Sequence, residues 1–467
     1  MTHSHLCQAV VIGGSIAGLL AARILCDRFE RVILIERDRF PDAPERRPGV
    51  PQATHVHALL TRGKYILEGL FPGLEAELMA MGVPRLNWTT DFRWYVGNTR
   101  QPNISSDLLT ATCSRPLLEW AIARRLRQFS NFELLENSKV TGFLTDSETS
   151  RIVGVRYQKY GQNSPEESQP ETLTADLVVD ASGRNSSTPK WLEELGDRSP
   201  EETVINSFLG YASRRYQIPA NFTAPWKGLY LQASPPHQKR GGVLYPVENN
   251  QWILTLAGLG RDYPPGDEAG FLAFAESLAD PILYEAIRHA EPLSPIHCYR
   301  RTENCRRHYE KLSRMPEGLA VLGDAVCAFN PVYGQGMTTA AVGAITLAEC
   351  LDHPQGMTGL TRRFQQQLAG KIRDPWLMAT GEDSRWETTE GKKPDLMTRF
   401  MQGYLDRLLQ LTSRHPEMYR TFIEVVHMIK PPAALFHPRY IMWILGDRIG
   451  FKPPISQTET SQILSTK

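Results

Sequence analysis

The amino-acid sequence predicts an α/β protein with a parallel sheet, an inserted and mainly antiparallel sheet, and a helical C-terminal region. Three observations support this fold class. An apolar strand, a glycine turn, a helix and a second apolar strand follow one another near the N-terminus. Short strands separated by turn residues dominate residues 202–258, and helices rich in Met, Arg and aromatic residues follow Lys371.

Residues 10–12 and 32–35 are predicted to be the two buried strands of a Rossmann-like βαβ unit, because each is a short apolar run. Glu36 ends the second strand, 23 positions after Gly13, where such units place the carboxylate that holds a ribose hydroxyl. Gly13 makes the turn out of the first strand, and Gly18 lets the helix pack close to the sheet. The residues predicted to surround a pyrophosphate at this turn are Gly13, Gly14, Ser15, Ile16, Ala17 and Gly18.

Ser15 stands where the second glycine of the G-x-G-x-x-G pattern belongs. Serine adds little bulk, so a phosphate can still approach the backbone and the free N–H groups of the helix N-terminus. A βαβ unit without a ligand is the alternative interpretation. A signal peptide is excluded, since the apolar stretch contains Arg23, lacks a basic flank and continues into another strand.

Length and composition limit the classes of protein that fit. A chain of 467 residues predicts about three domain-sized units, or two with elaborations. With 52 basic and 51 acidic residues, the formal charge of +1 argues against nucleic acid as the main partner. Seven dispersed cysteines without a C-x-x-C pair indicate reduced thiols, a cytoplasmic setting and no metal site. No apolar run is long enough to predict a transmembrane helix.

The segment after the second strand is predicted to be a loop followed by a helix. Residues 37–51 are charged and rich in proline, which predicts a loop. Its basic side chains, which include Arg37, are expected either to lie over a phosphate or an adenine ring or to be solvated. Residues 52–71 are predicted to form a helix with His55 and His57 on different faces. Because no further ligands stand nearby, these histidines are interpreted as polar lining of a pocket or as core residues.

The middle of the chain is predicted to contain more strands and one helix with a charged N-terminus. Residues 88–99 form an aromatic-rich strand, and a helix begins at Arg115 after the capping residue Ser114. Arg115 is thereby within reach of a cofactor phosphate or ribityl chain. Further strands are expected at residues 132–144, 152–159 and 177–180, and a hairpin at residues 242–247 and 251–256.

A second glycine-bearing turn lies between residues 318 and 347. A buried strand at residues 319–322 ends in Gly323-Asp324-Ala325, and Pro331, Gly334 and Gly336 precede a helix that begins at Met337. An acid at a strand end suits sugar hydroxyls, and the two glycines let a flat ring approach the backbone. The positive end of the helix is expected to point at that ring, which suits a flavin.

The expected domain organisation is discontinuous. The nucleotide-binding domain takes residues 1–85, 105–190 and 295–375, and the substrate-binding domain takes residues 86–104 and 191–294. The C-terminal region, residues 376–467, begins with a polar linker at 381–395 and continues with helices expected at 400–411, 419–428 and 440–449. These helices either cover the active site as a packed cap or lean on a membrane, a weak peripheral contact at most.

These motifs together resemble a known family. The turn at residues 11–18, Gly323-Asp324-Ala325 and Pro331-x-x-Gly334-x-Gly336 are similar to the single-component FAD-dependent monooxygenases of the p-hydroxybenzoate hydroxylase fold, over residues 8–375. Gly49-Val50-Pro51-Gln52 with His55-x-His57, and residues 327–338, most resemble bacterial epoxidases of polyketide and polyether biosynthesis.

The resemblance implies an FAD-binding domain of the GR2 type and a role for individual residues. Glu36 would hold the adenosine ribose, Arg115 would reach the FAD linker, and Asp324 would bind a ribityl oxygen. Val140 would meet adenine through its backbone, and Gly334 to Met337 would border the isoalloxazine. The cofactor residues outside the first turn are thus Glu36, Arg37, Arg115, Val140, Asp324, Pro331, Gly334, Gly336 and Met337. The substrate pocket is assigned to Gln52, His57, Tyr245 and Tyr333.

The implied activity is the insertion of one oxygen atom from O2 into a hydrophobic natural product through a flavin C4a-hydroperoxide, as epoxidation or hydroxylation. FAD is the cofactor, and NADPH is the electron donor, directly or through an external flavin reductase. No acid–base pair stands out, so no catalytic residue is assigned. Five aromatic and apolar residues of the inserted strands are expected either to exclude water from the pocket or to belong to the hydrophobic core. These residues are Phe208, Tyr230, Leu244, Tyr245 and Trp252.

Three departures from the family pattern leave alternatives open. Asp180-Ala181-Ser182-Gly183 replaces the usual Asp-Gly and resembles flavin halogenases and geranylgeranyl reductases, although their aromatic motifs are absent. Cys327 replaces a histidine, and Thr338 replaces an asparagine. The alternatives are an FAD-dependent reductase or dehydrogenase of an isoprenoid-like substrate, and a non-catalytic carrier on the same fold.

Overall fold

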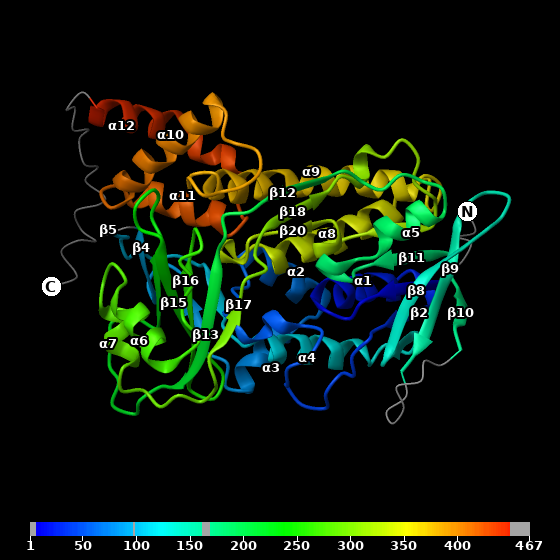
Figure 1. Ribbon diagram of the computed structural model, residues 1–467, viewed down its shortest axis with the longest axis horizontal. Coiled ribbons are helices and arrows are strands. Elements are labelled where there is room, and N and C mark those ends of the chain that lie inside the picture. Colours follow the sequence, from blue (N-terminus) through cyan, green and yellow to red (C-terminus); the bar gives the residue numbers. More distant parts are fainter. Residues whose placement is uncertain (1–5, 97–98, 161–168, 449–467) are drawn as a thin grey trace.

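The computed structural model describes residues 6–96, 99–160 and 169–448 of the chain (Figure 1). A five-stranded parallel sheet in the order β19-β11-β1-β2-β7 forms its centre. The strands are β1 (Leu6–Ile12), β2 (Phe29–Ile35), β7 (Phe132–Leu135), β11 (Leu177–Asp180) and β19 (Leu319–Val321). Both faces of this sheet are covered, which is why the buried parts of its strands, such as residues 9–12, 32–35 and 177–179, are apolar runs. The predicted α/β class with a parallel sheet is confirmed.

Helices cover this sheet and bring distant parts of the chain together. Helix α8 packs against both α1 and α9, and α4 also contacts α1. Gly18 allows the close fit of α1 to the preceding turn, since a Cβ at this position would lie 1.8 Å from the carbonyl oxygen of Gly13. The helices around the sheet are α1 (Ile16–Cys26), α2 (Thr61–Leu70), α3 (Leu74–Ala80), α4 (Arg115–Leu126), α5 (Thr188–Glu194), α8 (Gly336–Leu351) and α9 (Leu360–Asp383).

Small sheets and short turns complete this part of the molecule. An antiparallel meander joins β8 (Ser138–Thr145), β9 (Ile152–Lys159) and β10 (Glu171–Thr174) at the right of Figure 1. Further ladders pair β3 (Arg85–Asn87) with β6 (Leu109–Ala111), and join β12 (Glu202–Ile205), β18 (Asn304–Arg307) and β20 (Cys327–Ala328). The 3-10 turns are η1 (Pro51–Thr54), η2 (Gly183–Asn185), η3 (Tyr309–Lys311), η4 (Gly323–Ala325), η5 (Pro331–Tyr333) and η6 (Pro432–Phe436).

The inserted sheet has seven strands in the order β17-β13-β16-β15-β14-β4-β5 and is antiparallel except for the pair β14·β4. Its hairpin of β15 and β16 turns through residues 248–250, as predicted, with Asn249 and Asn250 at positive φ. One face packs on α6 (Glu268–Glu276) and α7 (Ile282–Ile287). The strands are β4 (Phe92–Val96), β5 (Thr99–Arg100), β13 (Gly210–Gln217), β14 (Gly228–Gln232), β15 (Arg240–Val247), β16 (Gln251–Gly258) and β17 (His297–Tyr299).

Three C-terminal helices lie beside the inserted sheet, at the upper left of Figure 1. They are α10 (Leu396–Thr412), α11 (Pro416–Val426) and α12 (Pro438–Arg448). They share a small core of their own, and Tyr419 and Ile423 of α11 pack on the inserted sheet. None of the helices among the described residues is both long and apolar enough to span a bilayer.

The structure corrects three expected elements. The helix expected at residues 52–71 begins only at Thr61, and residues 55–60 are extended. Side chains of the inserted sheet hold this segment, because Thr255 accepts a hydrogen bond from the Val56 amide at 3.0 Å and Ser213 bonds the His55 ring at 2.7 Å. The linker expected from residue 381 starts three residues later, since α9 ends at Asp383. The strand expected at residues 88–99 begins only at Phe92, and Thr99 belongs to the separate strand β5. Residues 97 and 98 of this expected strand and residue 449 of the last expected helix lie outside the described residues.

Candidate active site

One cavity of about 1060 Å³ joins the two glycine turns that the sequence singled out. Glu36 and Asp324, from opposite ends of the sequence pattern, both line it. Every cofactor residue predicted from the sequence lines the cavity except Gly18, which packs inside the turn. The predicted substrate residues Gln52, His57, Tyr245 and Tyr333 line it as well.

The turn after β1 presents backbone donors to the cavity. Gly13 has φ +95° and donates its N–H to Ile35 at 2.9 Å, while a Cβ there would lie 2.8 Å from the Ala181 oxygen. The first turn of α1 contains no acidic residue, and the side chain of Ser15 does not cap it. The N–H groups at this helix end are therefore available to an anion, as a pyrophosphate requires.

Glu36 is held at the end of β2 by its own surroundings. One carboxylate oxygen accepts the Gly14 amide at 2.6 Å, and the other accepts the Asp38 amide at 3.0 Å. Arg47 lies 3.4 Å from the same carboxylate, and both side chains are buried. The carboxylate is therefore fixed in position beside the turn that would hold the pyrophosphate.

A buried ion network explains why Ser15 replaces a glycine. The Ser15 hydroxyl donates to Glu119 at 2.6 Å and accepts from Arg115 at 2.8 Å. Glu119 also pairs with Arg47 at 2.8 Å and with Arg115 at 2.8 Å. Arg47 and Glu119 were not predicted, because these contacts join residues 72 positions apart in the sequence.

The network gives the stability of the protein a defined pH dependence. Burial would raise the pKa of Glu119, but the charges of Arg115 and Arg47 and the hydrogen bond from Ser15 lower it to about 2. A depressed carboxyl pKa adds stability at neutral pH that is lost as the pH falls below its ordinary range towards 2. We expect Glu119→Gln to lower the free energy of unfolding at pH 7 by about 3 kcal/mol.

Urea unfolding of both proteins from about pH 7 down to pH 3 measures this difference, which should shrink as the solution becomes more acidic. The control is Glu133→Gln, which removes an exposed ion pair with Arg31 and should change stability by less than about 1 kcal/mol. A Glu119→Gln deficit that stays constant across this range would contradict the ionised network.

The second turn brings an acid and open backbone to the same cavity. Asp324 lies in η4, shortly after β19. Burial raises the pKa of Asp324 above its ordinary value, although the charges of Arg184 and Arg115 oppose this shift. Gly334 has φ +65°, and a Cβ on Gly336 would meet no atom within 4 Å. The backbone at the start of α8 is thus bare on the cavity side, as the approach of a flat ring requires.

Buried polar atoms at the start of α8 lack partners among the described residues. Gln335 Oε1 and Thr338 Oγ1 are buried without a hydrogen bond. Of the two, Gln335 lines the cavity, whereas Thr338 Oγ1 faces Gly63 of α2. Buried polar groups are nearly always paired, so the orphaned oxygen of Gln335 indicates a ligand with polar edges. This atom, together with the two helix N-termini, fits a dinucleotide whose ring carries hydrogen-bonding groups.

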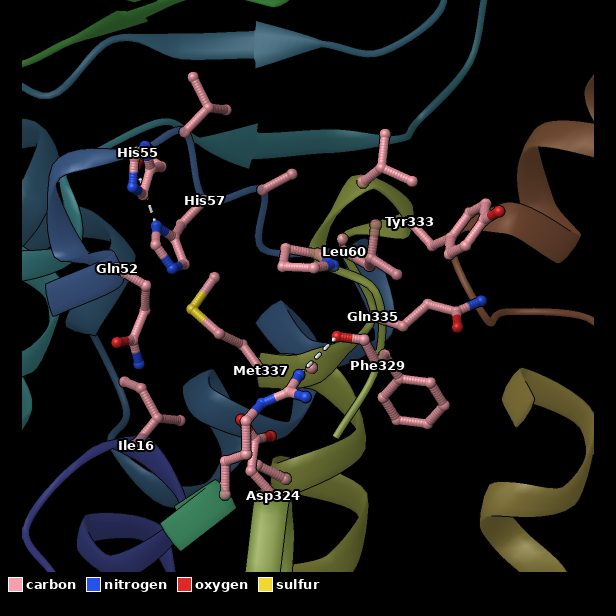
Figure 2. Close-up of a pocket in the computed structure, with 18 of the residues that line it drawn as sticks. Ile16, Gln52, His55, His57, Leu60, Asp324, Phe329, Tyr333, Gln335 and Met337 are labelled. Atoms are coloured by element: carbon pink, nitrogen blue, oxygen red, sulfur yellow. Dashed lines mark hydrogen bonds between the residues drawn. The ribbon is translucent and has the colours of Figure 1, made fainter. Parts of the chain in front are cut away.

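A pocket for a small molecule adjoins this turn. Figure 2 shows His57, Gln52 and Met337 around one space. The Nδ1–H of His57 donates to the His55 carbonyl at 3.0 Å, which leaves Nε2 as an acceptor. Burial and the charge of Arg115 lower the pKa of His57 to about 3, so the ring is neutral at physiological pH.

The inserted sheet supplies aromatic walls from only one of its faces. Tyr230 and Tyr245 line the cavity with Trp94, whereas Trp252 and Leu244 point to the core under α6 and α7. The alternation of side chains along a strand explains this separation of neighbours. Of the two alternatives left open for these five residues, pocket lining therefore holds for Tyr230 and Tyr245 and core for Leu244 and Trp252, while Phe208 does not line the cavity.

A buried carboxylate behind the pocket holds the loop that carries Gly334. Asp383, fully buried at the end of α9, accepts hydrogen bonds from Tyr333 at 2.7 Å, Asn330 at 3.0 Å and Asn304 at 2.6 Å. Burial raises the pKa of Asp383 to about 6. No sequence pattern marks this residue, which lies in the stretch interpreted as a linker.

The comparisons with known proteins agree with this geometry. The model of the FAD binding domain family matches residues 6–358, so the chain belongs to this family. FAD is therefore its cofactor, and the protein is an FAD-dependent oxidoreductase, as predicted. The residues around the two glycine turns fit FAD.

Two curated relatives and one solved structure are similar along most of the chain. Protein Rv3254 of Mycobacterium tuberculosis is 35% identical over 395 residues, 83% of this chain and 82% of that protein. Kynurenine 3-monooxygenase of Salinispora tropica is 26% identical over 365 residues, 76% of this chain and 74% of that protein. The myxobacterial chondrochloren halogenase CndH shares the fold, with a TM-score of 0.61, 17% identity and coverage of 92% and 96% of the two chains.

Proposed function

We propose that this protein is an FAD-dependent monooxygenase that inserts one oxygen atom from O2 into an apolar small molecule, by epoxidation of an alkene or by hydroxylation. The observation that carries the proposal is the single cavity that joins both glycine turns to an aromatic pocket. The likeness to a kynurenine 3-monooxygenase supports this class of reaction. The resemblance to bacterial polyketide and polyether epoxidases supports a natural product as the substrate.

FAD, when bound, supplies the redox and oxygen chemistry, and this chain's residues hold it and shape the space beside it. Glu36 would hold the adenosine ribose, the backbone of Val140 the adenine, and Asp324 a ribityl oxygen. The N–H groups at the start of α1 would bind the pyrophosphate, with Arg37 and Arg115 nearby. Pro331 and residues 334–337 would border the flavin ring.

The aromatic walls exclude water from the reacting centre. Trp94, Tyr230 and Tyr245 line the same cavity as Gly334, and burial raises the pKa of Tyr230 and Tyr245 above the ordinary range, so both hydroxyls stay protonated. A dry pocket keeps oxygen transfer ahead of the loss of hydrogen peroxide to solvent. Tight coupling of oxygen use to product is the expected result.

His57 orients the substrate as a neutral hydrogen-bond acceptor. With Nδ1–H bound to the His55 carbonyl, Nε2 has no partner among the described residues and adjoins the pocket. A substrate hydroxyl can donate to it without any change in the charge of the ring. Gln52 and Tyr333 complete the polar part of the pocket lining.

Two variants of His57 test this role. We expect His57→Phe to raise KM for hydroxyl-bearing substrates about tenfold, the loss of about 1.4 kcal/mol from one hydrogen bond, and to leave FAD content unchanged. His57→Gln keeps an acceptor and should restore most of the affinity. Because the pKa of His57 is about 3, the wild-type KM should not follow a histidine titration between pH 6 and 8. Equal losses in both variants, or a KM that titrates near pH 6.5, would contradict the role.

The activity test uses purified holoprotein, NADPH, O2 and a panel of olefins and phenols, with and without an external flavin reductase. We propose NADPH as the electron donor. The assays with and without the external reductase distinguish reduction of FAD by NADPH on this chain from reduction that needs a partner enzyme. Product heavier by one oxygen atom supports monooxygenation. Product changed by two hydrogens indicates the reductase or dehydrogenase alternative, and halogen incorporation when bromide or chloride is added indicates a halogenase. Either result would overturn the proposal.

A further inference from the structure

The first turn of α10 carries an exposed apolar patch. Leu396, Met397 and Phe400 are 84%, 67% and 68% exposed, the highest values among large apolar side chains of the described residues. Leu377 of α9 is 59% exposed. Three neighbouring apolar side chains of this size at one helix end are more than the scattered exposure of an ordinary surface.

Contacts between the two helices bring Leu377 beside this turn. Gln402 donates to the Gly381 carbonyl at 2.7 Å, and Asp406 pairs with Arg385 one helical turn further on. Both contacts join residues 21 positions apart, which means that the two segments run in the same direction side by side. One helical turn before Gly381, Leu377 therefore lies beside Thr398 in the first turn of α10. We define the apolar tip as Leu377, Leu396, Met397 and Phe400.

The apolar tip borders the end of the cavity that lies under the C-terminal helices. Leu377 and Met397 line the cavity, and so do Met401 and Leu405 further along α10. A path therefore continues from the tip towards the aromatic pocket beside the inserted sheet. The polar residues Glu382, Thr398 and Gln402 line it together with these apolar side chains.

Exposed basic side chains flank the apolar tip. Lys392, Lys393 and Arg399 are exposed and form no ion pair within the described part of the chain. The ammonium group of Lys393 donates only to the backbone carbonyls of Glu387 and Thr389. Three acids lie close by: Asp395 caps α10 through the Thr398 amide at 2.8 Å and also interacts with the charge of Lys392, Asp374 pairs with Arg373 at 3.3 Å, and Glu387 is exposed.

From this arrangement we infer that the apolar tip and its basic flank dock on an anionic lipid bilayer surface, from which an apolar substrate enters the cavity. Exposed Leu, Met and Phe side chains insert at the acyl boundary, while neighbouring lysines and arginines attract anionic headgroups. Lys393 and Arg399, which form no ion pair among the described residues, are the charges that an anionic headgroup would pair with and a neutral protein partner would not. The identity of the substrate that enters from the bilayer rests on the proposed function, whereas the docking of the protein on the bilayer does not.

Sedimentation of the FAD-loaded full chain with lipid vesicles tests the docking without any substrate. We expect binding to phosphatidylcholine vesicles containing about a third phosphatidylglycerol, and at least about tenfold weaker binding to phosphatidylcholine alone. The double variant L396S/F400S should lose about tenfold or more, since it removes most of the inserted apolar area. K392E/K393E should lose at least as much and abolish the salt dependence.

Matched controls separate this surface from general stickiness and charge. M442S removes an exposed apolar side chain of α12, and K190E/K311E makes the same change of net charge on α5 and η3. Both should bind within about twofold of wild type. Absence of binding to anionic vesicles, equal binding by tip and control variants, or a wild-type dimer that L396S/F400S dissociates would overturn the inference. Because no turnover is measured, its failure is separate from failure of the proposed reaction.

Discussion

Replacing Gly18 with alanine is expected to give a protein that does not retain FAD and is less stable by about 3 kcal/mol or more. The added Cβ would lie 1.8 Å from the carbonyl oxygen of Gly13 and 2.9 Å from its carbonyl carbon. These are backbone atoms, and Gly13 cannot retreat because it is tied to β2 and abuts Ala181. Helix α1 must therefore move, which withdraws the N–H groups that the pyrophosphate needs.

The ratio of flavin to polypeptide absorbance after gel filtration measures retention, and urea unfolding measures stability. Gly403→Ala is the matched control, since Gly403 lies inside α10 with no atom within 4 Å of the added Cβ. Alanine there should stabilise the protein by up to about 1 kcal/mol through helix propensity and leave the flavin content unchanged. A Gly18→Ala protein with full flavin content would contradict the assignment of this turn.

Asp383→Ala is expected to reduce the free energy of unfolding by about 3–5 kcal/mol and to disturb the flavin environment. The substitution leaves the buried donors of Asn304, Asn330 and Tyr333 without their shared acceptor. Asn330 and Tyr333 flank the loop that leads into α8, so this loop should shift against the ring. Urea unfolding and the visible circular dichroism of bound flavin measure the two effects. Normal stability with an unchanged flavin signal would contradict this role.

The same carboxyl predicts a pH dependence opposite in sign to that of Glu119. Because the pKa of Asp383 is raised to about 6, the folded protein binds a proton between about pH 4 and 6 that the unfolded chain has already released. Its contribution to stability is therefore greatest below about pH 4 and declines as the pH rises through 6. The non-titrating variant Asp383→Asn should lack this decline, so wild type loses stability relative to it between pH 4 and 7. A difference that does not change with pH would contradict this assignment.

The parts of the site that the sequence predicted depend on local patterns. Residues 10–36 specify a strand, turn, helix and strand through apolar runs and glycine positions, and the structure reproduces all four. The turn at Gly334 is similarly local, because its glycines and the following helix are adjacent in the chain. The family and its cofactor follow from these two turns.

The parts that were missed depend on contacts between distant residues. Nothing near Glu119 reveals that Ser15 and Arg47 meet it, and Asp383 reads as the start of a polar linker until Asn304 and Asn330 are seen against it. Residues 55–60 carry helix-compatible side chains, but Ser213 and Thr255 of the inserted sheet bind their polar groups and keep them extended. Tertiary hydrogen bonds here override local preference.

The extended segment at His55 to Leu60 also ties the two sheets mechanically. At one end the Val56 amide is bound by Thr255 and the His55 ring by Ser213, and α2, which follows the segment, packs against α8. A bulky guest that displaces Ser213 or Thr255 would therefore shift the imidazole of His57 and press on α2 and on α8, whose first residues would border the flavin ring. Variants that enlarge the chamber for larger substrates should therefore leave Ser213 and Thr255 unchanged.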